Sequence, residues 1–284
     1  MKIELKNKIT LGLWLLFALT ILVLFVAASN HKKNSFCTGT KLQISGNYQT
    51  YFVTEAEVAA IINANGTITE KLLKNIDISS LEIALQKNAW IKNAELFFDN
   101  NGILHIDVEQ RQPIARLFTI NGSSSYIDKD GLRLPIKNTA TARVLTITGF
   151  TSDNDILTHI DSTLLMNIKS VANYIQTDSF WNAQIAQLDI ITAEKFELIP
   201  TIGNHTIKIG DANNLKEKFS RLFTFYTKAW LQNGMDTYES IDVRFINQVI
   251  ATRKGASINI VDSSRLVFNS IDSLNHFTID SFGY

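Results

Sequence analysis

The stretch AELFFDNNGILHIDVEQ, residues 94–110, decides the fold of the first part of the chain. Within it, Leu104, Ile106 and Val108 share one face of an alternating segment, as in a strand that buries one side. The polar run D-N-N-G lies between this segment and the apolar residues before it, which is typical of a hairpin turn. We therefore predict two antiparallel strands over residues 94–98 and 103–110.

Two helix starts precede this hairpin, each in the pattern Ser/Thr-x-x-Glu. Thr54 and Glu57 stand before VAAII, and Ser79 and Glu82 stand before IALQ. In such a capping box the hydroxyl and the carboxylate each accept a hydrogen bond from a free backbone N–H, so these carboxylates have a structural role. With a short strand at residues 42–45, the order is strand, helix, helix, strand, strand. This predicts a small α+β unit with one core.

A second region follows Pro113 and mixes strands with helices. A helical stripe of apolar residues covers residues 161–176, and the longest predicted helix covers residues 213–233. The pattern indicates a second mixed domain built on a largely antiparallel sheet with helices. We interpret residues 254–284 as either a loose extension or one further edge element. The predicted strands are residues 114–120, 143–150, 184–191, 196–202, 206–210 and the pair within 239–253.

The N-terminal residues 9–28 carry no charge and are long enough, at about 30 Å, to cross the hydrocarbon core of a bilayer. Lys2, Lys6 and Lys8 precede this segment, which favours a cytoplasmic N-terminus with the bulk of the chain outside. The residues at 26–28, Val-Ala-Ala, resemble a signal-peptide cleavage site, so a cleaved leader is the alternative. The apolar run exceeds the usual length of a signal core, and we expect an uncleaved transmembrane helix.

Composition excludes several classes of function. Lysine and arginine number 27 and aspartate and glutamate also 27, so no basic field indicates nucleic acid as a partner. The single cysteine, Cys37, allows no intrachain disulfide, and we interpret it as a linker thiol. The five histidines show no zinc-binding spacing, and no nucleophile motif or phosphate-binding glycine loop occurs. We therefore predict no catalytic residues, no metal, no cofactor and no enzyme activity.

Several motifs together resemble the bacterial cell-division family FtsQ/DivIB. The family's P-W-V-x-x-A step after a second helix corresponds to residues 89–94, AWIKNA, with Ala89 where proline is usual. Its V-x-E-x-x-P-x-A junction is similar to residues 108–116, VEQRQPIAR. YIDKDGLRLP resembles a family hairpin, VLTITGF a short family strand, and IDVRF the family's IDLRY strand, with Phe245 where tyrosine is usual.

The resemblance implies a domain order. It implies a cytoplasmic tail at residues 1–8, a transmembrane helix at 9–28, a linker at 29–40, a POTRA domain at 41–112 and a β domain at 113–253. Residues 254–284 match nothing in the family pattern. It also implies a protein of the bacterial inner membrane with one span and a periplasmic bulk.

The resemblance further implies a function without catalysis. Members of the family are scaffolds of the division complex, the divisome, and bind the single-span proteins FtsB and FtsL, among other membrane division proteins. FtsB is expected to add a strand to the open edge of the second domain's sheet, since main-chain bonds supply affinity in such pairing. The residues expected to contact the partner are Arg244, Phe245, Val249, Ala251 and Arg253. We expect charge reversal at Arg244 to leave folding nearly intact.

Two other classes of function remain open from the sequence. One is a POTRA-containing component of outer-membrane assembly or translocation, although such proteins usually carry repeated POTRA units and a β-barrel. The other is a secreted hydrolase whose site is dispersed in sequence. A deep pocket with converging polar groups would favour the hydrolase, and an open sheet edge near Arg244 would favour the scaffold.

Overall fold

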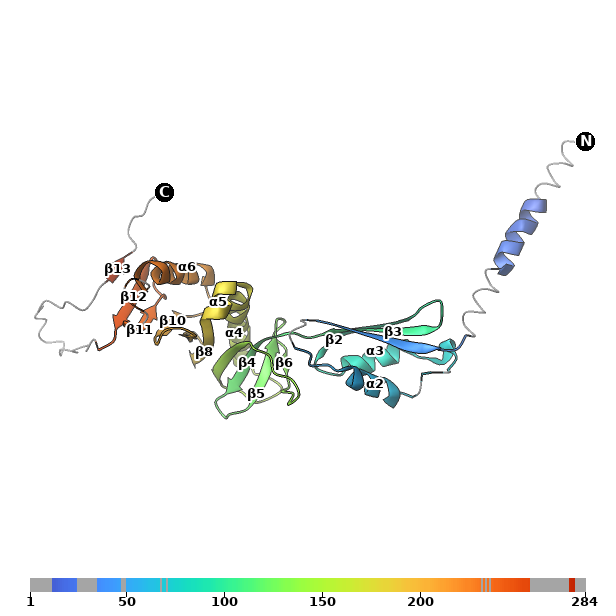
Figure 1. Cartoon of the computed structure of the whole chain (residues 1–284), viewed down its shortest axis with the longest axis horizontal. Coiled ribbons are helices and arrows are strands. Elements are labelled where there is room, and N and C mark those ends of the chain that lie inside the picture. The colour runs from blue at the N-terminus through green and yellow to red at the C-terminus, as the bar shows by residue number, and fades with distance from the viewer. Residues whose placement is uncertain are drawn as a thin grey trace, which may run out of the picture. The chain divides into compact units, whose positions relative to one another are not determined.

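The computed structural model describes residues 12–24, 35–46, 50–66, 68–69, 71–230, 232, 234, 236–255 and 276–278. The chain forms two compact units, Met1–Arg111 and Gln112–Tyr284. Figure 1 shows the elements of each unit, and we describe the two separately.

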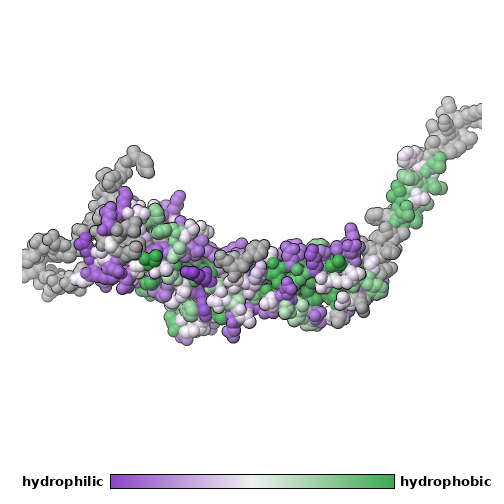
Figure 2. Space-filling model, in the orientation of Figure 1, coloured by the Kyte–Doolittle hydropathy of each residue, from purple (hydrophilic) through white to green (hydrophobic). Residues whose placement is uncertain are grey.

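Of the predicted transmembrane segment 9–28, the structure describes residues 12–24, which are helical. No helix in the described ranges combines the length and the apolar character needed to cross a bilayer. The side chains of this helix are nevertheless apolar and largely exposed, with Trp14 at 72% and Leu24 at 68%. Figure 2 shows hydrophobic residues gathered along the helix.

The rest of the first unit is a three-stranded sheet with two helices, as the sequence predicts. Strand β3 (Ile103–Gln110) lies in the centre, parallel to β1 (Gly39–Ser45) and antiparallel to β2 (Ile91–Phe98). The α-helices are α2 (Glu55–Ala64) and α3 (Ile78–Gln86), joined through the 3-10 turn η1 (Leu73–Asn75). Buried Leu104, Ile106 and Val108 form one face of β3, which confirms the predicted alternation.

The two predicted capping boxes have different outcomes. At α2, the Thr54 hydroxyl accepts from the Glu57 N–H and the Glu57 carboxylate accepts from the Thr54 N–H, which confirms the box. At α3 the prediction is wrong, because Asp77 is the N-cap and accepts from the N–H of Ser80. An aspartate two residues earlier is an equally strong cap and starts the helix sooner. Glu82 instead accepts from the backbone N–H of Leu96 on β2.

The predicted linker at residues 29–40 also needs a correction. Phe36 forms a β-bridge with Leu72, and the Cys37 N–H donates to the carbonyl of Lys71 over 2.9 Å. Cys37 is buried, at 1% exposure, and β1 begins at Gly39. Residues 35–40 therefore belong to the folded unit, and Cys37 is a small apolar core residue of the kind free cysteines commonly are.

The second unit is built on a ten-stranded sheet in the order β13-β12-β11-β10-β9-β8-β7-β4-β5-β6. The pairs β4–β7, β7–β8 and β10–β11 are parallel, and the other pairs are antiparallel. The largely antiparallel sheet is thus as predicted. Its strands are β4 (Pro113–Thr119), β5 (Ser124–Asp128), β6 (Arg133–Leu134), β7 (Leu145–Phe150), β8 (Ile185–Thr192), β9 (Lys195–Pro200), β10 (Thr206–Gly210), β11 (Tyr238–Asp242), β12 (Gln248–Arg253) and β13 (His276–Thr278).

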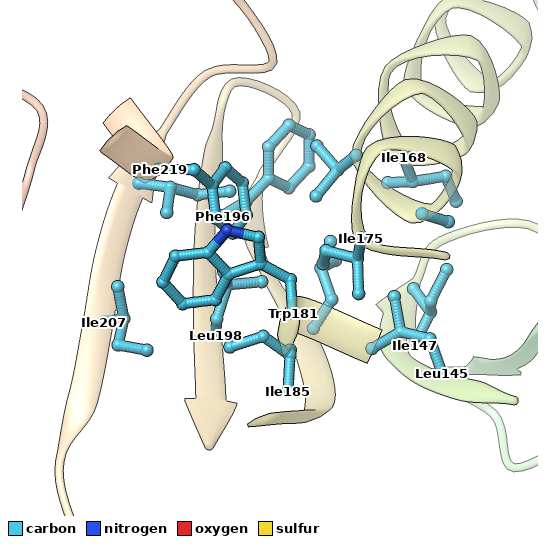
Figure 3. Close-up of a cluster of buried hydrophobic side chains, with 14 of the residues drawn as sticks. Leu145, Ile147, Ile168, Ile175, Trp181, Ile185, Phe196, Leu198, Ile207 and Phe219 are labelled. Carbon is cyan, nitrogen blue, oxygen red and sulfur yellow. The ribbon is translucent and has the colours of Figure 1, made fainter. Parts of the chain in front are cut away.

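Helices of the second unit pack on the sheet through one cluster of buried side chains. They are α4 (His159–Thr177), α5 (Ser179–Gln184) and α6 (Leu215–Phe225), followed by the π-helix η2 (Tyr226–Trp230). Figure 3 shows Trp181 of α5 among Phe196, Leu198 and Phe219. The ring centroids of Trp181 and Phe219 lie 4.9 Å apart. Alternate residues of the strands are more polar, so the sheet has one buried face.

The helices differ from prediction in two respects. The helix α5 was not expected, because six residues are too few to show a helical period. Asp178 caps it by accepting from the N–H groups of Phe180 and Trp181. The predicted helix at 213–233 begins at Leu215 as α6 and continues as η2, and Gln232 is again α-helical, while residues 231 and 233 lie outside the described part of the chain. The element α6 is shorter than α4 because the helix changes to π geometry at Tyr226.

One buried side chain, Gln110 at the end of β3, holds the segment that leads into α2. Its Oε1 accepts from the N–H groups of Phe52 and Val53, at 2.6 and 2.9 Å, and its Nε2 donates to the carbonyl of Thr50 at 3.0 Å. Gln110 is 2% exposed. Phe52 in turn stacks on Trp90, with centroids 3.8 Å apart. The amide therefore accepts from two buried N–H donors of the segment before α2.

We predict that Gln110→Leu lowers the free energy of unfolding by about 2 to 4 kcal/mol, because it leaves two buried donors unsatisfied. The same replacement at exposed Gln112 is the control and should change stability by less than about 0.5 kcal/mol. Urea unfolding of both full-length variants measures the difference. Equal stability of the two variants would show that the amide clamp contributes nothing.

Candidate functional site

The candidate site is the last hairpin of the sheet, formed by β11, the turn at residues 243–247 and β12. The strands pair antiparallel, with Ile241 opposite Ala251 and Asp242 opposite Ile250. Two bonds fix the start of the turn: the Val243 N–H donates to the carbonyl of Lys208 at 3.0 Å, and Arg221 donates to the carbonyl of Val243 at 2.8 Å. The turn is thus held both by β10 and by α6.

Arg244 is bound within its own chain. Its Nε donates to both oxygens of Asp242, at 2.9 and 3.0 Å, and its Nη2 lies 2.5 Å from Oδ2. The Arg244 N–H donates to the same carboxylate at 3.0 Å. The carboxylate of Asp242 raises the pKa of Arg244, so the guanidinium is always charged. The Arg244 side chain is 41% exposed, and its Nη1 makes no hydrogen bond to any residue that the structure describes.

A glycine makes room for this arginine. Gly210 has a φ of +66°, and a Cβ built on it would lie 3.0 Å from the Cγ of Arg244. The aliphatic part of the Arg244 side chain therefore lies directly on the backbone of β10. Position 210 favours glycine because its φ is positive and because a Cβ would crowd the arginine. The guanidinium carbon lies 5.6 Å from the ring centroid of Phe245. Asp242 and Gly210 contact Arg244 in the candidate site, and neither was predicted from the sequence.

The predicted contact residues divide into two groups. Arg244 and Phe245 lie in the turn with Ile246, and the turn presents exposed apolar surface, Phe245 at 43% and Ile246 at 84%. Val249, Ala251 and Arg253 lie at alternate positions of β12. Val249 is 2% exposed and belongs to the core cluster, and Ala251 packs against that cluster. Any contact that a partner makes along β12 at these residues therefore uses the backbone more than the side chains.

The predicted edge is not entirely open. Strand β13, His276–Thr278, pairs antiparallel with the first half of β12, with Gln248 opposite Thr278, Val249 opposite Phe277 and Ile250 opposite His276. Residues 254–284 thus contribute one further edge element, which was one of the two readings from sequence. The remaining residues of this segment after Gly255 lie outside the described part of the chain.

A buried histidine lies close to the other end of the hairpin. His205, just before β10, is 4% exposed, and its Nε2 lies 2.8 Å from the hydroxyl of Tyr226. It lines an open hollow of about 490 Å³ together with Glu239 and Lys254. Burial, assisted by the charge of Lys254, lowers the pKa of His205 to about 4. Burial also raises the pKa of Tyr226 above its usual value. The histidine is therefore neutral in the folded chain at neutral pH.

A second open hollow, of about 340 Å³, lies beside the turn and is lined by α6 residues and Asn247. Its described lining combines the charges of Lys216, Glu217 and Arg221 with the polar side chains of Ser220 and Asn247. Among the described residues, no three His, Cys, Asp or Glu side chains form a group able to hold a metal ion.

The order of the two units along the chain defines a class of protein, in which a POTRA-like domain is followed by a β domain. The family described as "POTRA-like domain" matches residues 35–109, and the family described as "FtsQ/DivIB, C-terminal related" matches residues 112–252. The boundary between the matches agrees with the boundary between the two compact units. Comparison with curated proteins found no significant match.

The chain belongs to the FtsQ/DivIB family. Both matched domains occur in the order that the family resemblance implies, and the second match ends within β12 at residue 252. Residues beyond the hairpin, including β13, lie outside the matched range. The two domains associate the chain with bacterial cell division.

The bond between Arg244 and Asp242 changes what we expect of charge reversal. Arg244→Glu would place a second carboxylate beside Asp242, which is 8% exposed and would lose its guanidinium donors while keeping the backbone N–H of residue 244. We predict a loss of about 1 to 2 kcal/mol in the free energy of unfolding. Arg244→Gln retains amide donors and should cost less than about 1 kcal/mol. Urea unfolding compares them, and an Arg244→Glu variant as stable as wild type would contradict the structural role.

His205 predicts a pH dependence of stability. Its pKa is about 4 in the folded chain and about 6.5 when unfolded, so the unfolded state binds a proton first as pH falls. Stability should therefore be full above about pH 6.5 and decrease as the pH falls toward about 4. Between about pH 7.5 and about pH 5 we expect a loss of about 2 kcal/mol from this residue. His205→Gln should remove that part of the slope in urea unfolding, and an unchanged slope would contradict the assignment.

Proposed function

We propose that this protein is a membrane-anchored, non-enzymatic scaffold of the bacterial divisome that binds single-span division proteins through the last hairpin of its sheet. The observation that carries the proposal is strand β12, whose outer edge β13 covers only over residues 248–250, together with the exposed apolar turn at its start. A strand at the end of a sheet offers backbone donors and acceptors to another chain. The family to which the chain belongs supports division as the setting.

The turn supplies the side chains that such docking needs. Phe245 and Ile246 are exposed large apolar residues, next to a guanidinium that is already held in place by Asp242. A fixed arginine loses little conformational freedom when a partner carboxylate binds, and its Nη1 makes no hydrogen bond to a described residue. The proposed partners are FtsB- and FtsL-like proteins, with FtsB adding a strand. Val249, Ala251 and Arg253 contribute backbone and, at Arg253, a half-buried charge.

The N-terminal segment supports anchoring in the inner membrane. Its described helical residues 12–24 expose apolar side chains around the helix, which water would not favour (Figure 2). The lysines before it favour a cytoplasmic N-terminus, which leaves the bulk of the chain in the periplasm. No catalytic activity is included in the proposal, since the carboxylate beside the turn, Asp242, is already bound by Arg244.

We predict that Ile246→Asp weakens capture of a detergent-solubilised FtsB-like protein by about tenfold or more, because it puts a charge in the apolar part of the contact. Ile246 is 84% exposed, so the variant should fold as wild type does. Ile156→Asp is the matched control, since Ile156 is 89% exposed in the same unit and distant in sequence. Immobilised full-length chain and quantitative pull-down measure capture. Equal capture by both variants would disprove docking at the turn.

A further inference from the structure

The edge proposed for docking already has an occupant in this chain. In the sheet order, β13 is the terminal strand and β12 the next, and β12 has β11 on its other side. The register joins residues 248–250 of β12 to His276–Thr278. The chain between Gly255 and His276 comprises residues 256–275, which is more than enough length for a return to the adjacent strand.

Pairing along one edge of a strand is exclusive. Each edge presents its N–H and C=O groups once, and a second strand cannot bind groups that are already paired. Over residues 248–250, β13 and a partner strand therefore compete for the same backbone groups. We propose that the C-terminal strand β13 covers the docking edge and that a strand-donating partner must displace it. This inference rests on the proposed function, because it concerns access to the same edge.

The positions of the covered and uncovered residues show how displacement can begin. β12 extends to Arg253, and the register with β13 ends at Ile250, so residues 251–253 have no β13 partner within the described chain. On the other side of the covered residues lies the turn with exposed Phe245 and Ile246. A partner that uses both the turn and the far end of β12 must pass over residues 248–250. It can pair at either end first and then replace β13 residue by residue.

The short length of β13 makes it replaceable. It pairs over three residues, whereas β12 offers six to a longer strand. A longer partner strand forms more backbone bonds along the same edge, so exchange favours the partner when it is present. In its absence β13 covers residues 248–250 and protects that part of the edge from non-specific pairing, a need that natural sheets meet in several ways. The apparent association constant for the partner is the intrinsic constant multiplied by the fraction of chains in which β13 is released. Occupation by β13 therefore weakens the apparent affinity.

A reversible cross-link tests occupancy in the full chain. Gln248 and Thr278 are directly opposite, a separation that a disulfide can bridge, so Gln248→Cys/Thr278→Cys should cross-link under mild oxidation. Asn121→Cys/Thr278→Cys is the control, because Asn121 lies in the turn between β4 and β5 toward the opposite end of the sheet. The native Cys37 is buried and common to both. Equal cross-linking of the two double variants would overturn the proposal.

Release of β13 is tested with a peptide of the chain's own sequence. Two variants are needed, Phe277→Pro and the double variant His276→Pro/Thr278→Pro. Between them they remove the N–H of every β13 position, so at least one variant must break the pairing. The fluorescent peptide SLNHFTID, residues 273–280, should bind the released chain at least about tenfold more tightly than wild type or the oxidised cross-linked chain. Equal peptide binding by all three would show that the edge is not occupied, and would overturn the proposal.

Displacement itself is tested by the capture assay with the FtsB-like protein. The oxidised Gln248→Cys/Thr278→Cys chain should capture it about tenfold less than the same chain after reduction, and the proline variants should capture it better than wild type. If Ile246→Asp abolishes capture but oxidation does not reduce it, docking stands and displacement of β13 is overturned. If neither change affects capture, the docking edge itself is wrong, whereas the cross-link and peptide results still report whether β13 pairs with β12.

Discussion

The backbone N–H and C=O groups of β12 need hydrogen-bond partners on both sides of the strand. This requirement determines how the last strands of the sheet are arranged. A strand has two edges, and in this sheet β11 satisfies one of them. The other must be met by water, by a partner or by the chain itself, and here β13 meets half of it. On this side of β7 the strands follow one another in sequence order, from β8 through β9 and β10 to β13. Under the proposed function, partner binding therefore depends on which strand pairs with the outer edge of β12.

The turn before β12 shows why the hairpin can serve as a fixed surface. Asp242 binds both the backbone and the guanidinium of Arg244, and Gly210 gives the arginine stem a place on β10. In the proposed docking, a partner would meet a charge that Asp242 already holds in place, next to two exposed apolar side chains. The bond between the two charged residues lies partly in solvent, so its value is more in geometry than in stability. The arginine is consequently both a structural residue and a candidate contact.

Local sequence patterns predicted a helix or strand correctly where a single local interaction determines where that element begins or turns. The hairpin at residues 94–110 followed from alternation and a D-N-N-G turn, and Thr54 was identified as a cap from its spacing to Glu57. The Ser79 cap failed because Asp77, equally suited and slightly earlier, starts the helix instead. α5 was missed because its six residues contain no complete period.

The strand pair that carries the candidate site was predictable from the sequence, but the contacts of its turn were not. The resemblance led to Arg244 and Phe245, and Asp242 stands two residues before Arg244, a spacing that puts both on one side of an extended segment. That signal could have indicated the internal pair. The role of Gly210 depends on the approach of β10 to the turn, which no local pattern contains. Occupation of the edge by β13 is likewise a contact between residues far apart in sequence.

An edge strand that is covered by its own chain can still be specific. A three-residue strand gives up few bonds when it leaves, and any partner that replaces it must regain them and add more along residues 251–253 and at the turn. A short or poorly matched strand gains nothing over β13 and is excluded. The cost of displacing β13 therefore falls on every competitor equally, while the extra contacts favour the partner whose length and side chains fit both ends of β12.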